Sequence, residues 1–196
     1  MHVLIVLDHP NPASFTAAAA QRFADGATDA GHSVELADLN AEGFDPRWTM
    51  DDATADGIAP AQPDVAREQA RIERADAICL AFPLFWWGMP AMTKGWVDRV
   101  WTWNWAYDQL DDREKSLQRA RSGVLLIPAG ARSDDMTDAG YLNALETAWM
   151  QGTFGYFGFS PRQMHILYGA TGSLPRRQAL LQQSYDIGHS LPLPSA

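Results

Sequence analysis

One segment combines aromatic residues, glycine and proline in a way that suits neither an ordinary strand nor an ordinary helix. It is FPLFWWGMPAMTKGWVDRVW, residues 82–101, and its first half carries Phe85, Trp86 and Trp87 in succession. Aromatic rings beside an irregular backbone offer flat apolar surface together with free peptide groups, which suits a planar heteroaromatic ligand. Ordinary core packing or a subunit contact would explain the same composition.

Two further segments carry candidate ligand groups. In DHPNPASFT, residues 8–16, Ser14 and Thr16 lie near the start of a predicted helix, where free N–H groups and the helix dipole favour a phosphate. Helix capping by Ser14 alone is the simpler alternative. In PAGARSDDMTDAG, residues 128–140, Ala129 and Gly130 are small enough for a ligand to approach the backbone. Neither segment contains GxGxxG or a P-loop, which disfavours Rossmann dinucleotide binding and phosphoryl transfer.

Five apolar segments predict the strands that must position these loops, at residues 3–7, 33–39, 76–82, 123–128 and 162–169. Helices are predicted between and after them, at residues 15–30, 64–74, 90–101, 141–157 and 176–185. This alternation predicts a parallel α/β sheet with helices on both faces. Ligands of such sheets bind at the carboxyl ends of the strands. We therefore expect the three loops to meet around a phosphorylated planar cofactor, for which a flavin is the natural candidate.

Length and composition narrow the class of protein. The 196 residues, 46% of them hydrophobic and 20% charged, predict one globular α/β domain over residues 1–196. A net charge of −9 disfavours binding to nucleic acid or to anionic membranes. The N-terminus resembles no signal peptide and no apolar run approaches about 18 residues, so we expect a cytoplasmic protein without membrane insertion. We expect the single cysteine, Cys79, to be buried, and we expect no metal site.

The aromatic segment resembles a family signature. Residues 82–101 are similar to the pattern F-P-L-x-W-x-G-x-P-A-x-x-K-G-W-x-x-R-V-[FW] of the flavodoxin-like NAD(P)H:quinone oxidoreductases, the DT-diaphorase family. The flavin reductase subunits of glutathione-gated potassium efflux systems share this pattern. LIVLDHPNPASFT and DLNAEGFDP resemble further elements of the family, with Asn40 in place of a tyrosine, and the likeness extends over most of the chain.

The resemblance implies a fold and a reaction. The fold would be a flavodoxin-like, doubly wound, five-stranded parallel sheet with helices on both faces. The reaction would be a ping-pong cycle in which NAD(P)H passes hydride to flavin N5 and a quinone then takes two electrons. FAD is the expected flavin, with FMN as the alternative, and NAD(P)H is the co-substrate.

The resemblance also assigns roles to individual residues. Residues implied to bind the flavin are His9, Ser14, Phe15, Thr16, Pro83, Leu84, Phe85, Trp86, Trp87, Pro128, Ala129 and Gly130. Trp105 and Tyr107 would bind the substrates, and Tyr107 and Tyr141 are the candidate catalytic side chains. Animal members carry Tyr and His where this chain has Asp135 and Tyr141, and we expect Asp135 to be a solvated loop residue.

Partners and alternatives follow from the same resemblance. It implies a homodimer, for which the tryptophan-rich segment 96–105 is a plausible contact, with Trp96 inward and Lys94 and Arg99 solvated. A regulatory flavoprotein subunit that docks on a potassium efflux channel is one alternative. A flavodoxin-type electron carrier is another, and it predicts a stable one-electron radical. We expect His165 to be a structural strand residue and His189 to belong to the tail.

Overall fold

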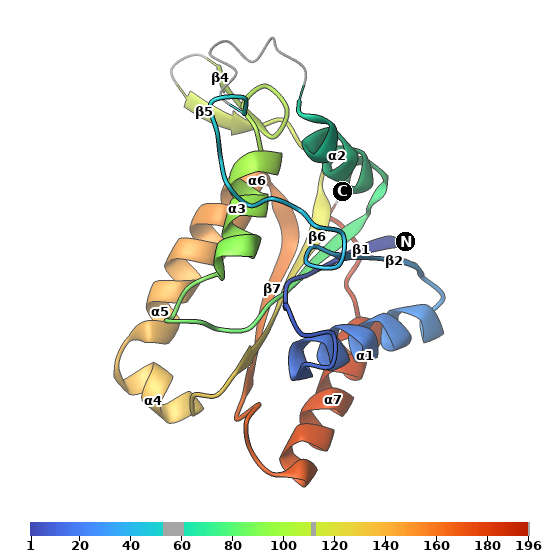
Figure 1. The fold of residues 1–196 in the computed structure, drawn as a ribbon, viewed down its shortest axis with the longest axis vertical. Helices are drawn as coiled ribbons and strands as arrows, with labels where there is room; N and C mark the ends of the chain where they lie inside the picture. Colours follow the sequence, from blue (N-terminus) through green and yellow to red (C-terminus); the bar gives the residue numbers. More distant parts are fainter. Residues whose placement is uncertain (53–60, 111–112, 196) are drawn as a thin grey trace.

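A parallel five-stranded sheet forms the centre of the molecule (Figure 1). The computed structural model describes residues 1–52, 61–110 and 113–195. The strands lie in the order β2-β1-β3-β6-β7, and their bounds are β1 (His2–Leu7), β2 (Ser33–Asp38), β3 (Ala77–Ala81), β6 (Arg121–Ala129) and β7 (Phe159–Tyr168). The predicted α/β fold with a five-stranded parallel sheet is confirmed, although β6 and β7 begin earlier than the apolar pattern indicated.

Helices cover both faces of this sheet. They are α1 (Phe15–Asp29), α2 (Pro63–Arg74), α3 (Ala91–Val100), α4 (Ser133–Asp138), α5 (Tyr141–Leu145), the π-helix η1 (Glu146–Thr153), α6 (Phe154–Phe157) and α7 (Leu174–His189). The single helix predicted over residues 141–157 is thus a continuous run of α5, η1 and α6. His189 ends α7 and is not part of the tail. An antiparallel hairpin of β4 (Tyr107–Leu110) and β5 (Arg113–Ser116) was not predicted.

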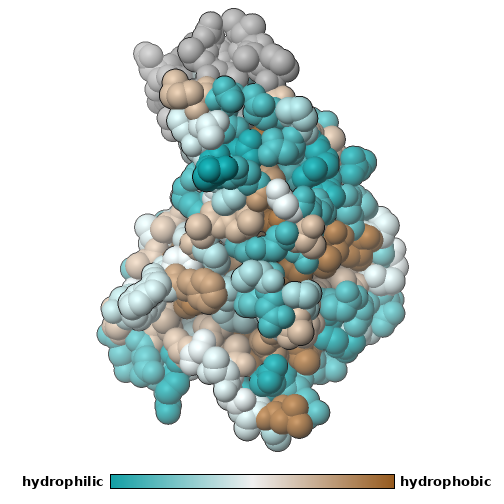
Figure 2. Space-filling view, viewed as in Figure 1, coloured by the Kyte–Doolittle hydropathy of each residue, from teal (hydrophilic) through white to brown (hydrophobic). Residues whose placement is uncertain are grey.

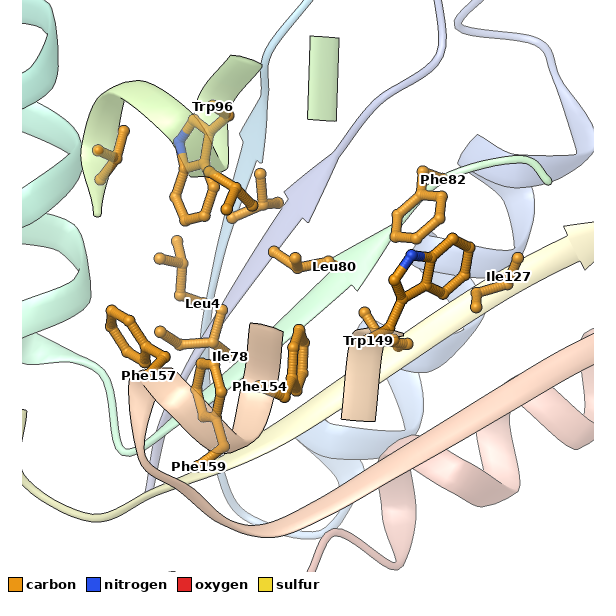
Figure 3. Close-up of a cluster of buried hydrophobic side chains, with 14 of the residues drawn as sticks. Leu4, Ile78, Leu80, Phe82, Trp96, Ile127, Trp149, Phe154, Phe157 and Phe159 are labelled. Carbon is orange, nitrogen blue, oxygen red and sulfur yellow. The ribbon is translucent and has the colours of Figure 1, made fainter. Parts of the chain in front are cut away.

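Alternate residues of the strands point into two separate hydrophobic cores, one on each face of the sheet. Val3 and Ile5 of β1 face a cluster with Phe23 of α1, whereas Leu4 and Val6 face the opposite cluster, as the two-residue period of a strand requires. Figure 3 shows the second core, where aromatic side chains from α3, η1, α6 and the start of β7 pack over the sheet. Both faces are therefore sealed by apolar side chains.

Helix α3 is tied to its surroundings by Arg99. The guanidinium donates to Asp64 at 2.6 and 3.1 Å, to Asp52 at 3.0 Å and to the carbonyl of Asp45 at 2.6 Å. Arg99 is only 6% exposed, so the expectation of a solvated Arg99 is wrong, because partners from other segments satisfy its charge. Burial opposes the ionised form of Asp64, but the hydrogen bonds from Arg99 outweigh it and lower the pKa of this carboxyl.

Gly95 and Trp96 of α3 make close contacts with two other segments of the chain. A Cβ on Gly95 would lie 2.1 Å from the carbonyl oxygen of Pro46, so only glycine lets that loop cross the helix. Trp96 is fully buried, as predicted, and its Nε1 donates to the buried carboxylate of Glu68 at 3.1 Å. Lys94 is exposed, also as predicted. Three adjacent residues of α3 thus have different environments: Lys94 lies in solvent, Gly95 allows another segment to cross the helix, and Trp96 is buried.

The surface is mainly polar on the face shown in Figure 2, where apolar side chains form small separate groups. Several large apolar side chains are exposed among the described residues, including Trp48, Met50 and Trp86. Among these residues, no helix has both the length and the apolar character that crossing a bilayer requires.

Candidate functional site

The loops that follow β1, β3 and β6 meet at the carboxyl edge of the sheet. The N–H of Asp8, directly after β1, donates to the carbonyl of Ala81 at the end of β3 at 2.9 Å. The N–H of Leu84 donates to the carbonyl of Pro128 in β6, also at 2.9 Å. The predicted convergence of the three loops is therefore confirmed. The loops meet at the point where the strand order changes direction, since β2 lies on one side of β1 and β3 on the other.

The loop between β3 and α3, residues 83–89, is called the aromatic loop below. Trp86 and Trp87 both have left-handed backbone conformations, with φ of 49° and 54°. They form a tight turn closed by a hydrogen bond from the N–H of Gly88 to the carbonyl of Phe85 at 2.9 Å. Two positive φ angles characterise the type I′ turn, which normally selects Asn and Gly. Two bulky residues in these positions carry backbone strain, a feature that clusters at functional sites.

The aromatic loop also leaves its rings in solvent. Phe85 is 51% exposed, Trp86 90% and Trp87 44%. The Trp87 ring lies against Tyr141, the first residue of α5, with 4.8 Å between ring centroids and 35° between planes. The aromatic loop and the predicted catalytic Tyr141 are therefore brought together. Rings so exposed are not core residues, which removes the core-packing explanation for Phe85, Trp86 and Trp87.

The loop after β1 presents the start of α1. Ser14 is the N-cap of α1, and its Oγ accepts a hydrogen bond from the N–H of Ala17 at 3.1 Å. The N–H groups of Phe15 and Thr16 precede the first intrahelical hydrogen bond and are the donors a helix start offers to an anion. The Thr16 side chain is buried. Its hydroxyl is thus not presented at the surface, while its backbone remains at the helix start.

His9 and the third loop complete this edge. The Nδ1 of His9 accepts a hydrogen bond from the N–H of Asn11 at 3.0 Å, which holds the ring over its own turn. Ala129 and Gly130, with Leu84, Trp86, Trp87 and Ala131, line a shallow pocket of about 180 Å³. A Cβ on Gly130 would make only ordinary contact with Thr171 at 3.5 Å. Packing within the chain therefore does not require glycine here.

The predicted substrate-binding residues lie elsewhere in the same chain. Trp105 and Tyr107 follow α3, whereas the aromatic loop precedes it, and ten helical residues span about 15 Å. Figure 1 shows α3 between the two, with the β4–β5 hairpin at its far end. Tyr107 packs on Tyr156 with 5.2 Å between centroids, and Trp105 donates from Nε1 to Glu73 at 3.0 Å. Within one chain, Trp105 and Tyr107 are therefore not brought together with the aromatic loop.

Three residues considered in the sequence analysis remain: a buried cysteine, a strand histidine and an exposed aspartate. Cys79 is fully buried, and burial raises the pKa of its thiol. His165 lies in β7, where burial lowers the pKa of its imidazole, and it contacts Gln163 at 3.4 Å. Asp135 is exposed as expected, but it lies in the short helix α4 and not in a loop. The part of the chain that the structure describes holds no cluster of His, Cys, Asp or Glu suited to a metal ion.

Comparison with known proteins agrees with this geometry. Residues 1–187 match the family model described as Flavodoxin-like fold. A solved NAD(P)H:quinone oxidoreductase from Methanothermobacter marburgensis is 30% identical, with a TM-score of 0.87 over 97% of this chain and 98% of the other. The chain belongs to the flavodoxin-like NAD(P)H:quinone oxidoreductase family. The resemblance seen in the aromatic segment is thereby confirmed.

Curated relatives of the family give the same assignment. NAD(P)H dehydrogenase (quinone) 1 from Cavia porcellus is 29% identical over 187 residues, which are 85% of this chain and 68% of the relative. An uncharacterized NAD(P)H oxidoreductase from Haemophilus influenzae is 31% identical over 161 residues, covering 81% and 79% of the two chains. The protein is therefore an oxidoreductase.

Two residues at the carboxyl edge were missed by sequence reasoning. Asp8 is buried between the ends of β1 and β3, and its position directly after a continuous apolar strand was the available signal. Arg177 lies with its guanidinium 5.3 Å from the centre of the Phe15 ring. No local pattern marked Arg177, because 161 residues separate it from Phe15 in the sequence. In this member of the family both residues belong to the edge formed by the three loops.

Proposed function

We propose that this oxidoreductase is a flavin-dependent NAD(P)H:quinone oxidoreductase that works by a ping-pong cycle. The observation that carries the proposal is the aromatic loop, whose Trp86 and Trp87 are held in left-handed conformations with their rings in solvent. Strain and exposure both oppose stability, so a ligand that uses these rings explains why they are retained. The flavin is FAD in this proposal, with FMN as the alternative.

The residues at the carboxyl edge fit such a cofactor. A helix start with a serine cap suits a phosphate, and the guanidinium of Arg177 beside Phe15 adds a positive charge there. The rings of the aromatic loop suit an apolar planar ring system, and the space at Gly130 is not taken by packing. A bound flavin supplies the two-electron chemistry, accepting hydride from NAD(P)H and reducing a quinone in alternate half-reactions.

The side chains and peptide groups of this chain supply binding and orientation. We assign the N–H groups of Phe85, Trp86 and Trp87 to the polar edge of the ring system, since these peptide units lie outside any strand ladder. Tyr141 carries a hydroxyl beside Trp87 and is our candidate donor to an oxygen of the bound partner. The apolar rings exclude water from the face on which nicotinamide and quinone alternate.

We propose further that the site is formed between two copies of the chain. The pocket at the aromatic loop, about 180 Å³, is smaller than the roughly 300 Å³ at which ligand pockets begin. A larger apolar hollow of about 310 Å³, lined by Tyr107, Tyr156 and Phe157 among others, lies beside the C-terminal end of α3. In this proposal a two-fold axis pairs the α3 helices antiparallel, so that the hollow of one subunit would cover the aromatic loop of its partner. Trp105 and Tyr107 then serve the partner's site.

The first test identifies the cofactor and the reaction. We expect the purified protein to be yellow, and the flavin released by acid to be identified as FAD or FMN by chromatography. Steady-state rates with NADH or NADPH and a panel of quinones should give parallel double-reciprocal lines. A protein that takes up neither flavin, or a bound flavin that NAD(P)H does not reduce, would show that the proposal is wrong.

The second test asks whether two chains share one site. Trp86→Ala and Tyr107→Ala should each lower quinone reduction, because each removes one wall of every site. After exchange of subunits between the two variants, about half of the dimers are mixed, and one of the two sites in each mixed dimer is intact. Activity should then return to about a quarter of the wild-type value. A mixture no more active than either variant would place both residues in the same subunit's site.

A further inference from the structure

Asp8 is a buried carboxylate behind the aromatic loop, and none of the roles assigned above uses it. We propose that Asp8 is a positioning residue that holds the aromatic loop in its binding conformation by capping α3 from a distant part of the chain. The consequence for flavin binding rests on the proposed function, whereas the capping itself does not.

Helix α3 begins without a cap of its own. Its N-cap residue is Pro90, which offers no side-chain acceptor for the free N–H groups of the first turn. The Oδ2 of Asp8 accepts from the N–H of Thr93 at 2.9 Å and from its Oγ1 at 2.7 Å. Thr93 is the third residue of α3, the position at which an N-cap side chain normally bonds. Asp8 thus supplies, from the end of β1, the acceptor that the local sequence lacks.

Asp8 is itself fixed from the other side. Its Oδ1 accepts from Nδ2 of Asn40 at 3.0 Å, and its own N–H donates to Ala81 at 2.9 Å. The residue is 4% exposed, so these bonds are shielded from water and are stronger for it. The negative charge also lies at the positive end of the α3 dipole. The carboxylate therefore joins the segment after β2 to the start of α3, while the backbone N–H of Asp8 ties the end of β1 to β3.

This cap holds the chain just after the aromatic loop, and a backbone hydrogen bond holds the start of the loop. That bond runs from the N–H of Leu84 to Pro128. Between these points, the backbone hydrogen bond from Gly88 to Phe85 closes the turn on itself, and the Trp87 ring rests on Tyr141. Left-handed backbone at Trp86 and Trp87 persists only while the surroundings enforce it. Loss of the cap should let the loop relax, so that a smaller fraction of molecules presents the binding conformation.

Hydrogen–deuterium exchange of the full chain tests the cap directly. Asp8→Ala should speed exchange in residues 83–95 and leave exchange in β1, α1 and α7 unchanged. Thr93→Val should speed exchange in the same residues, 83–95, by a smaller factor. The matched control is Asp38→Ala, which removes a carboxylate at the end of another strand, β2, that accepts from the N–H groups of Asn40 and Ala41 at 3.1 and 3.0 Å. That control should leave exchange in residues 83–95 at the wild-type rate. Equal exchange there in all four proteins would overturn the proposal.

Measuring flavin affinity tests whether the Asp8 cap contributes to cofactor binding. Titration of flavin-free protein with FMN and, separately, with FAD should give a Kd about tenfold higher for Asp8→Ala, the scale of one lost helix cap. Asp8→Asn should stay within about threefold of wild type, because its amide oxygen still accepts from Thr93 while Asn40 can turn its own oxygen toward the new amide. Asp38→Ala should bind like wild type. Equal affinity in Asp8→Ala and wild type overturns the proposal, and so does an Asp8→Asn as weak as Asp8→Ala. If wild-type protein binds neither flavin, the proposed function fails, while the exchange experiment still decides the role of Asp8.

Discussion

Replacing Trp86 by asparagine should raise the stability of the protein while weakening flavin binding. A left-handed conformation costs a bulky residue about 1–2 kcal/mol, and asparagine tolerates it. Trp86 is 90% exposed, so removing the ring forfeits only about 0.5 kcal/mol of burial. Its tilted contact with Trp87, at 6.0 Å between centroids, accounts for about another 0.5 kcal/mol. The balance favours Trp86→Asn by about 0.5 kcal/mol, whereas loss of stacking should raise the flavin Kd several-fold.

Trp48→Asn is the matched control for this prediction. Trp48 is also an exposed tryptophan, at 53%, but its backbone is not left-handed, so its replacement relieves no strain. Loss of its buried half should cost about 2 kcal/mol. Urea denaturation of the flavin-free proteins measures both free energies of unfolding, and fluorescence titration measures the Kd. If Trp86→Asn loses as much stability as Trp48→Asn, the turn is not strained and the explanation of the exposed rings is wrong.

Three further predictions concern the scaffold. Gly95→Ala should lose about 2 kcal/mol in urea denaturation despite the higher helix propensity of alanine, because its Cβ would lie 2.1 Å from a carbonyl oxygen of the crossing loop. Gly152→Ala, whose Cβ meets its nearest atom at 3.5 Å, should be neutral or stabilising, and equal losses would contradict the reasoning. The lowered pKa of Asp64 means that its bond to Arg99 stabilises the fold fully above about pH 4 and less as pH falls through the lowered pKa. Asp64→Asn should therefore be less stable than wild type at pH 7 and approach it toward pH 2; a constant difference would refute this. Cys79 should resist a maleimide in buffer and react in urea, and rapid labelling of the native protein would contradict its burial.

The sheet could be predicted from sequence because its strands are continuous apolar segments. β1 and β3 are buried on both faces, so the segments VLIVL and AICLA carry no polar interruption. The meeting of the three loops followed from parallel topology alone, since all three leave carboxyl ends of strands. The β4–β5 hairpin could not be predicted in this way, because its charged segment shows neither the apolar period of a strand nor that of a helix.

The parts of the site that escaped prediction depend on contacts between distant residues. Arg99 was expected in solvent because its partners Asp52 and Asp64 lie 47 and 35 residues earlier in the chain. The left-handed turn at Trp86 and Trp87 contradicts local propensity, so no sequence rule would have placed it there. The separation of Tyr107 from the aromatic loop, in contrast, follows from the predicted helix between them and was available from the sequence.

The packing of α1 on α7 has a consequence for how the protein is made. A Cβ on Gly26 would lie 2.0 Å from the carbonyl oxygen of Tyr185, and one on Gly188 would lie 2.0 Å from that of Phe23, so the two helices touch backbone to backbone. The partner of α1 is thus α7, which is synthesised after every other described helix. Until α7 leaves the ribosome, one face of the sheet remains half covered while the loops of the site already exist. The nascent chain therefore passes through a stage with an exposed apolar face, which favours aggregation until α7 is in place.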